Sequence, residues 1–276
     1  MTTVEARPAA SVMLVRAAAP GAAEPIEVYM IRRQKGMKFL GGYYAFPGGR
    51  VDAADGAPEI LARCRGLDAA QAEALLSYAD GAPSQAESSP VPALAYWVTA
   101  ARELLEESGL LLGCDAAGRP IAGSTSEVVE AIERVRKALM AGSAPFAALL
   151  EGEGWYCDLA PLRYLSHFIT PRSSPIRFTA RFFLSPVPPG QVPRLFTEET
   201  SEGFWTPPGE GYRRFLAGEM PMAEPAEYGL AYLAQFESLP ALWTAHDDRR
   251  HKFHGIIDRI DVFWERFDWR ASRWRS

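Results

Sequence analysis

Acidic side chains recur at helical spacing in the middle of this chain. Glu103, Glu106 and Glu107 stand three and four residues apart, so on a helix they share one face. The opposite side is apolar and predicts a core-facing surface, made by Trp97, Val98, Ala101, Leu104 and Leu105. Carboxylates on a firmly packed helix suit a hard divalent cation, although solvated helices often carry similar clusters. The spacing alone therefore leaves a metal site and a plain acidic surface both open.

A glycine-rich segment upstream changes the interpretation. Residues 46–55 read Phe-Pro-Gly-Gly-Arg-Val-Asp-Ala-Ala-Asp, and residues 102–110 read Arg-Glu-Leu-Leu-Glu-Glu-Ser-Gly-Leu. Together they resemble the box of the Nudix hydrolases, Gx5Ex7REUxEExGU, in which U is a bulky apolar residue. Gly49 matches the opening glycine, and the second half of the box matches throughout. The resemblance implies an α/β fold, a Nudix-type α/β/α sandwich with a mixed β-sheet and a helical insertion.

The chain departs from the family pattern in two places. Asp55 stands six residues after Gly49, where a glutamate is expected, and 46 residues separate Asp55 from Arg102 where the pattern has seven. This long insertion is similar to the coenzyme A diphosphatases of the peroxisomal type and their bacterial relatives, as are the runs at 164–171 and 177–184. We expect a Nudix domain over residues 1–240, with the helical insertion at about 56–91, and a C-terminal extension of unknown role at 241–276.

The resemblance implies metal-dependent hydrolysis of a pyrophosphate bond in a nucleoside diphosphate derivative, with coenzyme A or an acyl-CoA as the expected substrate. Mg²⁺ or Mn²⁺ would neutralise the phosphate charges and activate water. The expected metal ligands are Glu103, Glu106, Glu107 and the carbonyl of Gly49. Arg102 is expected to pair with Asp55 or Glu103 and so to orient the carboxylates; its alternative role is that of a surface partner of Glu106. The catalytic candidates are Glu103, Arg102 and Glu199.

Further site residues are expected outside the box. Glu199 lies in an acidic loop six residues before Trp205, where the family often has a fourth ligand or general base, and Glu202 is the second choice. Arginine suits bidentate phosphate contact. The substrate-binding candidates are Arg32 and Arg33, which end a predicted strand, and Arg177 and Arg181, which share a face of another strand.

Composition and charge narrow the function class. The net charge of −5 argues against broad electrostatic binding of nucleic acid. The three cysteines are far apart in sequence and odd in number, which suits a reducing cytoplasm. No signal peptide and no membrane span is expected. We expect a small-molecule substrate and no nucleic-acid or membrane partner, and the sequence leaves a homodimer open. The alternatives are a nucleotide-sugar or dinucleotide pyrophosphatase, or a Nudix-fold ligand sensor with little turnover; intact box glutamates favour catalysis.

The pattern of apolar residues and turn formers predicts the elements that position the box. A β-hairpin is expected from residues 11–16 and 26–32, and the box helix from residues 92–108, ending at Gly109 in a left-handed conformation. Helices are expected near 58–65, 68–78, 126–141, 145–151, 209–217 and 225–236, and strands near 162–170, 177–185 and 204–206.

Overall fold

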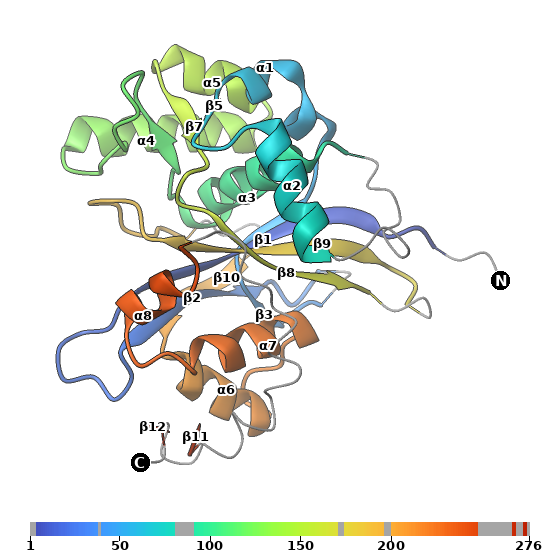
Figure 1. Ribbon diagram of the computed structural model, residues 1–276, viewed down its shortest axis with the longest axis vertical. Helices are drawn as coiled ribbons and strands as arrows, with labels where there is room; N and C mark the ends of the chain where they lie inside the picture. The colour runs from blue at the N-terminus through green and yellow to red at the C-terminus, as the bar shows by residue number, and fades with distance from the viewer. Residues whose placement is uncertain are drawn as a thin grey trace. The chain divides into compact units, whose positions relative to one another are not determined.

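The computed structural model describes residues 4–37, 40–80, 91–170, 174–195, 200–247, 267–268 and 273–274. The chain divides into two compact units, Met1–Val12 with Pro47–Phe196 and Met13–Phe46 with Thr197–Ser276. Strand β1 (Arg7–Ala17) runs through both (Figure 1). The boundary expected at residue 240 falls inside the second unit and stays a prediction, and most of the extension at 241–276 lies outside the described residues.

The first unit is a mixed α/β structure. Its elements after β1 are β4 (Gly48–Arg50), the 3₁₀ helix η1 (Ala53–Gly56), α1 (Pro58–Ala62), β5 (Cys64–Arg65), α2 (Ala69–Asp80), α3 (Ala93–Ser108), β6 (Gly113–Cys114), α4 (Ser126–Met140), α5 (Phe146–Gly152), β7 (Tyr156–Asp158), β8 (Arg163–Ile169) and β9 (Phe178–Pro186). Strand β4 pairs antiparallel with β1, placing Gly49 opposite Ala10, and β8 and β9 form an antiparallel hairpin. Strand β7 pairs in parallel with β5 and antiparallel with β6, which makes a small mixed sheet.

Helix α3 is the predicted box helix, and both of its ends are as expected within a residue. It starts after Pro92 and ends at Gly109, which has a φ of 70° in the left-handed region that favours glycine. Its apolar side packs on the β8–β9 hairpin, where the Trp97 ring lies 4.9 Å from Phe183 and 6.0 Å from Tyr164, centroid to centroid. The helix also contacts β4, η1, α1, α2 and α4. It is therefore fixed on several sides, as a scaffold for a site must be.

The insertion between the two halves of the box is part of the folded first unit. Ile60, Leu67, Ala72 and Leu76 are buried, and α2 packs on α3. The sequence predicted helices here, and the described part of the insertion contains α1 and α2. It did not predict β5, because two residues cannot show a strand period. Helix α1 ends at Ala62 rather than near residue 65 because the chain turns there into β5.

The three cysteines come together in the small mixed sheet, although they are far apart in sequence. Cys64 pairs in register with Cys157, Cys114 lies on the neighbouring strand, and all three are buried free thiols. Burial raises the pKa of the Cys114 thiol to about 11. These side chains therefore act here as small apolar residues.

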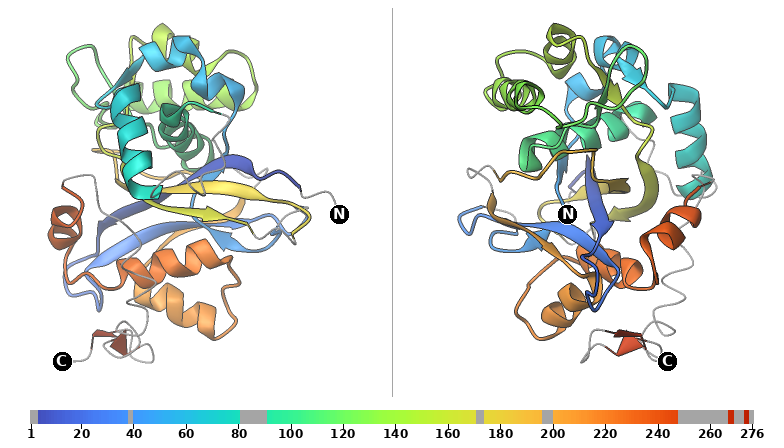
Figure 2. Two further views of the ribbon diagram at one scale, coloured as in Figure 1. Left: turned by 45° about the vertical axis from the view of Figure 1, so that its right-hand side comes forward. Right: turned by 90° about the vertical axis from the view of Figure 1, so that its left-hand side faces the viewer.

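The second unit combines the other part of β1 with later segments. Its elements are β2 (Ile26–Arg33), β3 (Tyr44–Ala45), β10 (Thr200–Thr206), α6 (Pro208–Leu216), α7 (Glu224–Leu233), α8 (Leu239–Thr244), β11 (Phe267–Asp268) and β12 (Arg273–Trp274). The predicted hairpin is confirmed, with Val15 opposite Val28, and β2 also pairs antiparallel with β3 and β10. Helices α6 and α7 lie side by side (Figure 2). Among the described residues no helix combines the length and apolar character needed to cross a bilayer.

Candidate active site

Helix α3 is buried on almost its whole circumference, and the exceptions mark the site. Of its sixteen residues, all of them described, only Glu103 and Glu106 keep partial exposure; their side chains are 12% and 24% exposed. The sequence predicted one buried face opposite an open acidic face. The structure instead leaves only these two carboxylates partly exposed, because β4, η1 and α4 also pack against the helix.

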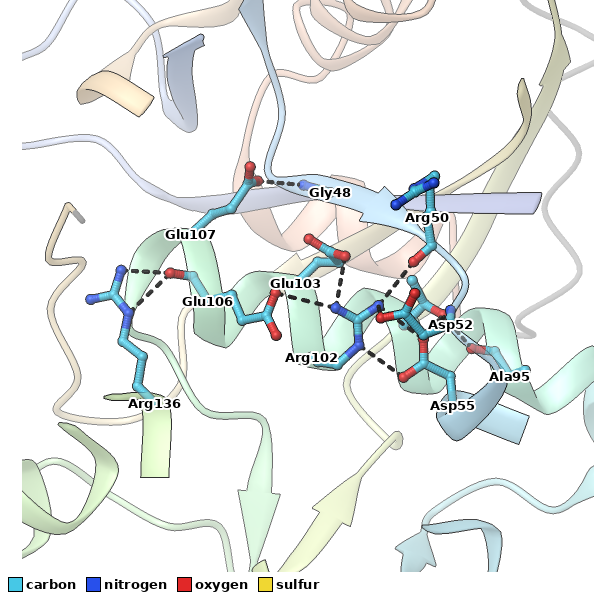
Figure 3. A network of polar contacts seen from close by, with 11 residues as sticks. Gly48, Arg50, Asp52, Asp55, Ala95, Arg102, Glu103, Glu106, Glu107 and Arg136 are labelled. Carbon is cyan, nitrogen blue, oxygen red and sulfur yellow. Dashed lines mark hydrogen bonds and ion pairs between the residues drawn. The ribbon is translucent and has the colours of Figure 1, made fainter. Parts of the chain in front are cut away.

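The Gly48–Gly49 segment lies directly against these carboxylates. The amide N–H of Gly48 donates a hydrogen bond of 2.7 Å to Glu107 Oε2 (Figure 3). A Cβ at Gly49 would overlap the Glu103 carboxylate, and one at Gly48 would overlap Ser11 and the carbonyl of Ala10 on β1. The Gly48–Gly49 pair in the sequence indicates a turn in which glycine lets the backbone come close to a metal or phosphate. Both residues are instead in a short strand without positive φ, and glycine is required there for close approach to Glu103 and to β1.

Arg102 joins the two halves of the box. Its guanidinium donates from Nε to Asp55 Oδ1 at 2.8 Å and from Nη2 to Asp55 Oδ2 at 2.9 Å. Nη1 donates to Glu103 at 2.8 Å and to Glu106 at 3.2 Å, and Nη2 also reaches the carbonyl of Arg50 at 2.9 Å (Figure 3). One side chain therefore contacts the strand that opens the box, the acid that replaces the family glutamate, and two of the helix carboxylates.

Asp55 is the buried centre of this network. It is 2% exposed and accepts hydrogen bonds from the Thr99 hydroxyl at 2.7 Å and the Asp52 amide at 3.0 Å, besides the fork from Arg102. The Asp52 side chain is 64% exposed and lies 3.8 Å from Arg102. The shorter side chain at position 55 thus still reaches the arginine, because η1 brings its backbone close to α3.

Burial and crowding shift the acid–base behaviour of the cluster. Burial raises the pKa of Glu103 to about 7, against the attraction of Arg102 and with the repulsion of Glu106. Burial likewise raises the pKa of Glu106, again opposed by Arg102. For Arg102 burial alone would lower the pKa, but the hydrogen bond to Asp55 and the surrounding carboxylates raise it overall. The cluster carries more carboxylates than its one guanidinium neutralises, an excess that a cation would relieve.

The carboxylates bond to protein donors rather than converging on one point. Glu103 and Glu106 accept from Arg102, and Glu107 accepts from Gly48. Within the described ranges, no three His, Cys, Asp or Glu side chains converge at metal-ligand distance. Neighbours at i, i+3 and i+4 have Cβ atoms roughly 5–6 Å apart, so side-chain rotation is enough to bring their oxygens together. The donor set, all hard oxygens, fits a divalent cation.

Comparison with known proteins decides the family. A family model described as the NUDT19 Nudix domain matches residues 6–233. The chain belongs to this Nudix family. A curated relative from Gallus gallus, the acyl-coenzyme A diphosphatase NUDT19, is 30% identical to this chain. The match covers 88% of this chain and 72% of the relative. A NUDIX hydrolase structure from Alicyclobacillus acidocaldarius is 32% identical, covers 87% of this chain and 96% of its own, and superposes with a TM-score of 0.66.

Membership in this family identifies the enzyme class of the protein. It is a Nudix hydrolase with a mixed α/β fold, as the box predicted. Nudix hydrolases generally use divalent metal ions. The sequence match and the side-chain network therefore indicate the same region, around β4, η1 and α3.

Arg50 is a site candidate that the sequence analysis missed. It follows Gly49 directly on β4, its side chain is exposed, and its carbonyl accepts a hydrogen bond from Arg102. Its guanidinium makes no hydrogen bond or ion pair with any part of the chain that the structure describes. A signal was available in the sequence, since a cation directly follows the glycine pair of the box.

Two of the predicted substrate-binding arginines are buried in the first unit. Arg177 is 3% exposed and donates to the carbonyls of Thr170 at 3.0 Å and Val4 at 2.6 Å. Arg181 is 6% exposed and lies over the Tyr96 ring, 4.2 Å from its centroid. These contacts give both side chains a packing role, and substrate binding by either stays a prediction.

The other candidates lie in the second unit or outside the described residues. Arg32 donates to the Gly42 carbonyl at 3.4 Å and lies over the Tyr44 ring. The carboxylate of Glu202 is 4.0 Å from the Arg32 guanidinium. Arg33 ends β2 opposite Thr200, and its Nε is buried without a hydrogen-bond partner among the described residues. Glu199 lies outside the described residues. The roles expected for these four side chains stay predictions.

Proposed function

We propose that this Nudix hydrolase cleaves the pyrophosphate bond of coenzyme A or an acyl-CoA with Mg²⁺ or Mn²⁺. The observation that carries the proposal is the Arg102 fork, which joins Asp55 to Glu103 and Glu106 across the 46 residues that separate the two halves of the box. The name of the Gallus gallus relative, at 30% identity, supports the substrate class.

Glu103, Glu106 and Glu107 would hold the cation, with the Gly49 carbonyl as a further oxygen. When bound, a divalent cation neutralises the diphosphate charge and lowers the pKa of water. Arg102 limits where the Glu103 and Glu106 carboxylates can point, because both bond to the same nitrogen. Glu103, which lies against Gly49, and Glu199 are the proposed proton acceptors. On α3 only the side chains of Glu103 and Glu106 are partly exposed, so these two carboxylates are the accessible members of the proposed ligand set.

A substrate panel tests the proposal. We expect coenzyme A and acyl-CoAs to give the highest kcat/KM with Mg²⁺ or Mn²⁺ among coenzyme A, acyl-CoAs, NADH, ADP-ribose and diadenosine polyphosphates. Products are separated by liquid chromatography, with coenzyme A yielding a phosphopantetheine and 3′,5′-ADP. If coenzyme A is the poorest substrate, the assignment fails in favour of a nucleotide-sugar or dinucleotide pyrophosphatase. If no compound turns over but one binds, the chain is a ligand sensor.

Arg50 is proposed to contact the substrate phosphates. Arg50→Ala should raise KM about 10-fold or more with a smaller change in kcat, because a hydrogen bond to a charged group contributes roughly 1.5–3 kcal/mol. Steady-state kinetics on the best substrate of the panel measure this. Arg119→Ala is the matched control, since Arg119 is exposed in the same unit and pairs with Asp115. An unchanged KM in Arg50→Ala would remove the residue from the site.

A further inference from the structure

The last turn of α3 carries two of the proposed cation ligands, Glu106 and Glu107. The final carbonyls of a helix have no partner within it, so last turns tend to fray. A frayed turn would move both carboxylates relative to Glu103, which lies one turn earlier. The proposed site therefore needs something that holds this end of the helix.

A side chain from another helix holds it. Arg136 on α4 donates from Nε at 3.0 Å and from Nη2 at 2.6 Å to the carbonyl of Glu106 (Figure 3). Its Nη1 donates to the carbonyl of Arg194 at 2.9 Å. Arg136 is fully buried, with 0% exposure, and Glu133 Oε2 is 3.9 Å from Nη1.

Backbone contacts complete the end of the helix. The amide of Gly109 donates to the Leu105 carbonyl at 2.9 Å, and the amide of Arg194 donates to the Ser108 carbonyl at 2.7 Å. The carbonyl of Arg194 accepts a hydrogen bond from Arg136. The backbone of Arg194 is therefore bonded both to the end of α3 and to the Arg136 side chain. Two of the last four carbonyls of α3, those of Glu106 and Ser108, thus accept hydrogen bonds from other segments of the chain.

Burying a charged guanidinium costs free energy unless its N–H groups have acceptors. The placement of the buried Arg136 against main-chain carbonyls therefore requires an explanation. A cation at a helix C-terminus is favourable, because the carbonyls there carry partial negative charge. A planar fork also fixes direction, which a single ammonium does not. Both properties apply at Glu106, whose carbonyl Arg136 holds while its carboxylate bonds to Arg102.

We infer that Arg136 is a positioning residue for the cation site. It fixes the last turn of α3 through the Glu106 carbonyl, so that Glu106 and Glu107 keep their place relative to Glu103. The inference rests on the proposed function for the identity of the ligand, a divalent cation. It adds a residue from outside the Nudix box, 27 positions beyond Gly109.

The test compares the full-length protein with Arg136→Lys, which keeps the charge and loses the fork. Mn²⁺ binding without substrate is measured by isothermal titration calorimetry, well below the Tm of each protein. We expect the Kd for Mn²⁺ to rise about 10-fold or more in Arg136→Lys, as for other residues that orient metal ligands. Hydrogen–deuterium exchange should be faster at the amides of residues 106–109. Arg134→Lys is the matched control, because Arg134 is on the same helix, exposed, and 3.2 Å from Glu153.

The outcomes are separable. Equal Mn²⁺ affinity and equal exchange in Arg136→Lys and wild type overturn the inference. If Arg136→Lys does not fold, exchange in the wild-type protein decides: protection at residues 106–109 equal to that of the middle of α3 supports it, and rapid exchange there overturns it. If the wild type binds no Mn²⁺, the proposed function fails, while the exchange data still decide whether Arg136 fixes the turn.

Discussion

Glu106→Gln is expected to lower kcat/KM by more than about 100-fold on the best substrate, because a metal ligand contributes several kcal/mol of transition-state stabilisation and each 1.36 kcal/mol is a factor of ten. The Glu106 side chain is 24% exposed. The substitution removes a charge without changing shape, so the fold should be kept. Turnover with Mg²⁺ and with Mn²⁺, and Tm, are the measurements.

The control for this substitution is Glu130→Gln. Glu130 is an exposed glutamate on α4, and its loss should leave turnover unchanged. Full activity in Glu106→Gln would refute the role of Glu106 as a ligand. A fall in activity together with a large fall in Tm would assign the effect to folding, so both quantities are needed.

Asp55→Asn should lower the free energy of unfolding by about 3–5 kcal/mol, because it removes the most buried of the carboxylates that pair with the buried Arg102. Asp55 is 2% exposed and takes two hydrogen bonds from Arg102. The loss should appear as a lower midpoint in urea. Activity should fall as well, because Arg102 also bonds to Glu103 and Glu106 and would change its position.

Asp52→Asn is the matched control three residues away. Its side chain is 64% exposed and 3.8 Å from Arg102, so the expected cost is less than about 1 kcal/mol. Similar urea midpoints for the Asp55 and Asp52 variants would show that the buried fork does not stabilise the first unit.

The sequence was sufficient for the main helix of the site and for the family. The apolar positions of α3 and the glycine at 109 are local signals, and local signals predicted both ends of that helix. The hydrogen-bond partners of Arg102 were harder to predict. Sequence spacing shows which residues can approach one another, but not which of several carboxylates a guanidinium will bind. Asp55 and Glu103 were open alternatives, and the structure shows both contacts.

The remaining misses have specific causes. Gly48 and Gly49 were expected in a turn that approaches a metal or phosphate, whereas they lie in a strand and their small size allows packing between β1 and Glu103, a contact between distant segments. Arg136 was missed although a signal existed. It lies four residues after Ile132 and one after Val135, so helical periodicity places it on the buried face of α4. Arginine on an apolar stripe should have suggested a long-range partner.

The Arg102–Asp55 pair also bears on how the box can tolerate its interruption. These two residues stand on either side of the inserted segment. Their hydrogen bond therefore holds the two ends of that segment together. The entropy of closing a flexible loop grows only logarithmically, by about 0.6 kcal/mol for each doubling of length. Once the ion pair holds the two ends, lengthening a flexible part of the segment between them therefore adds little to the free energy of folding. A motif divided in this way can therefore accept segments of very different size at the same point without losing its geometry.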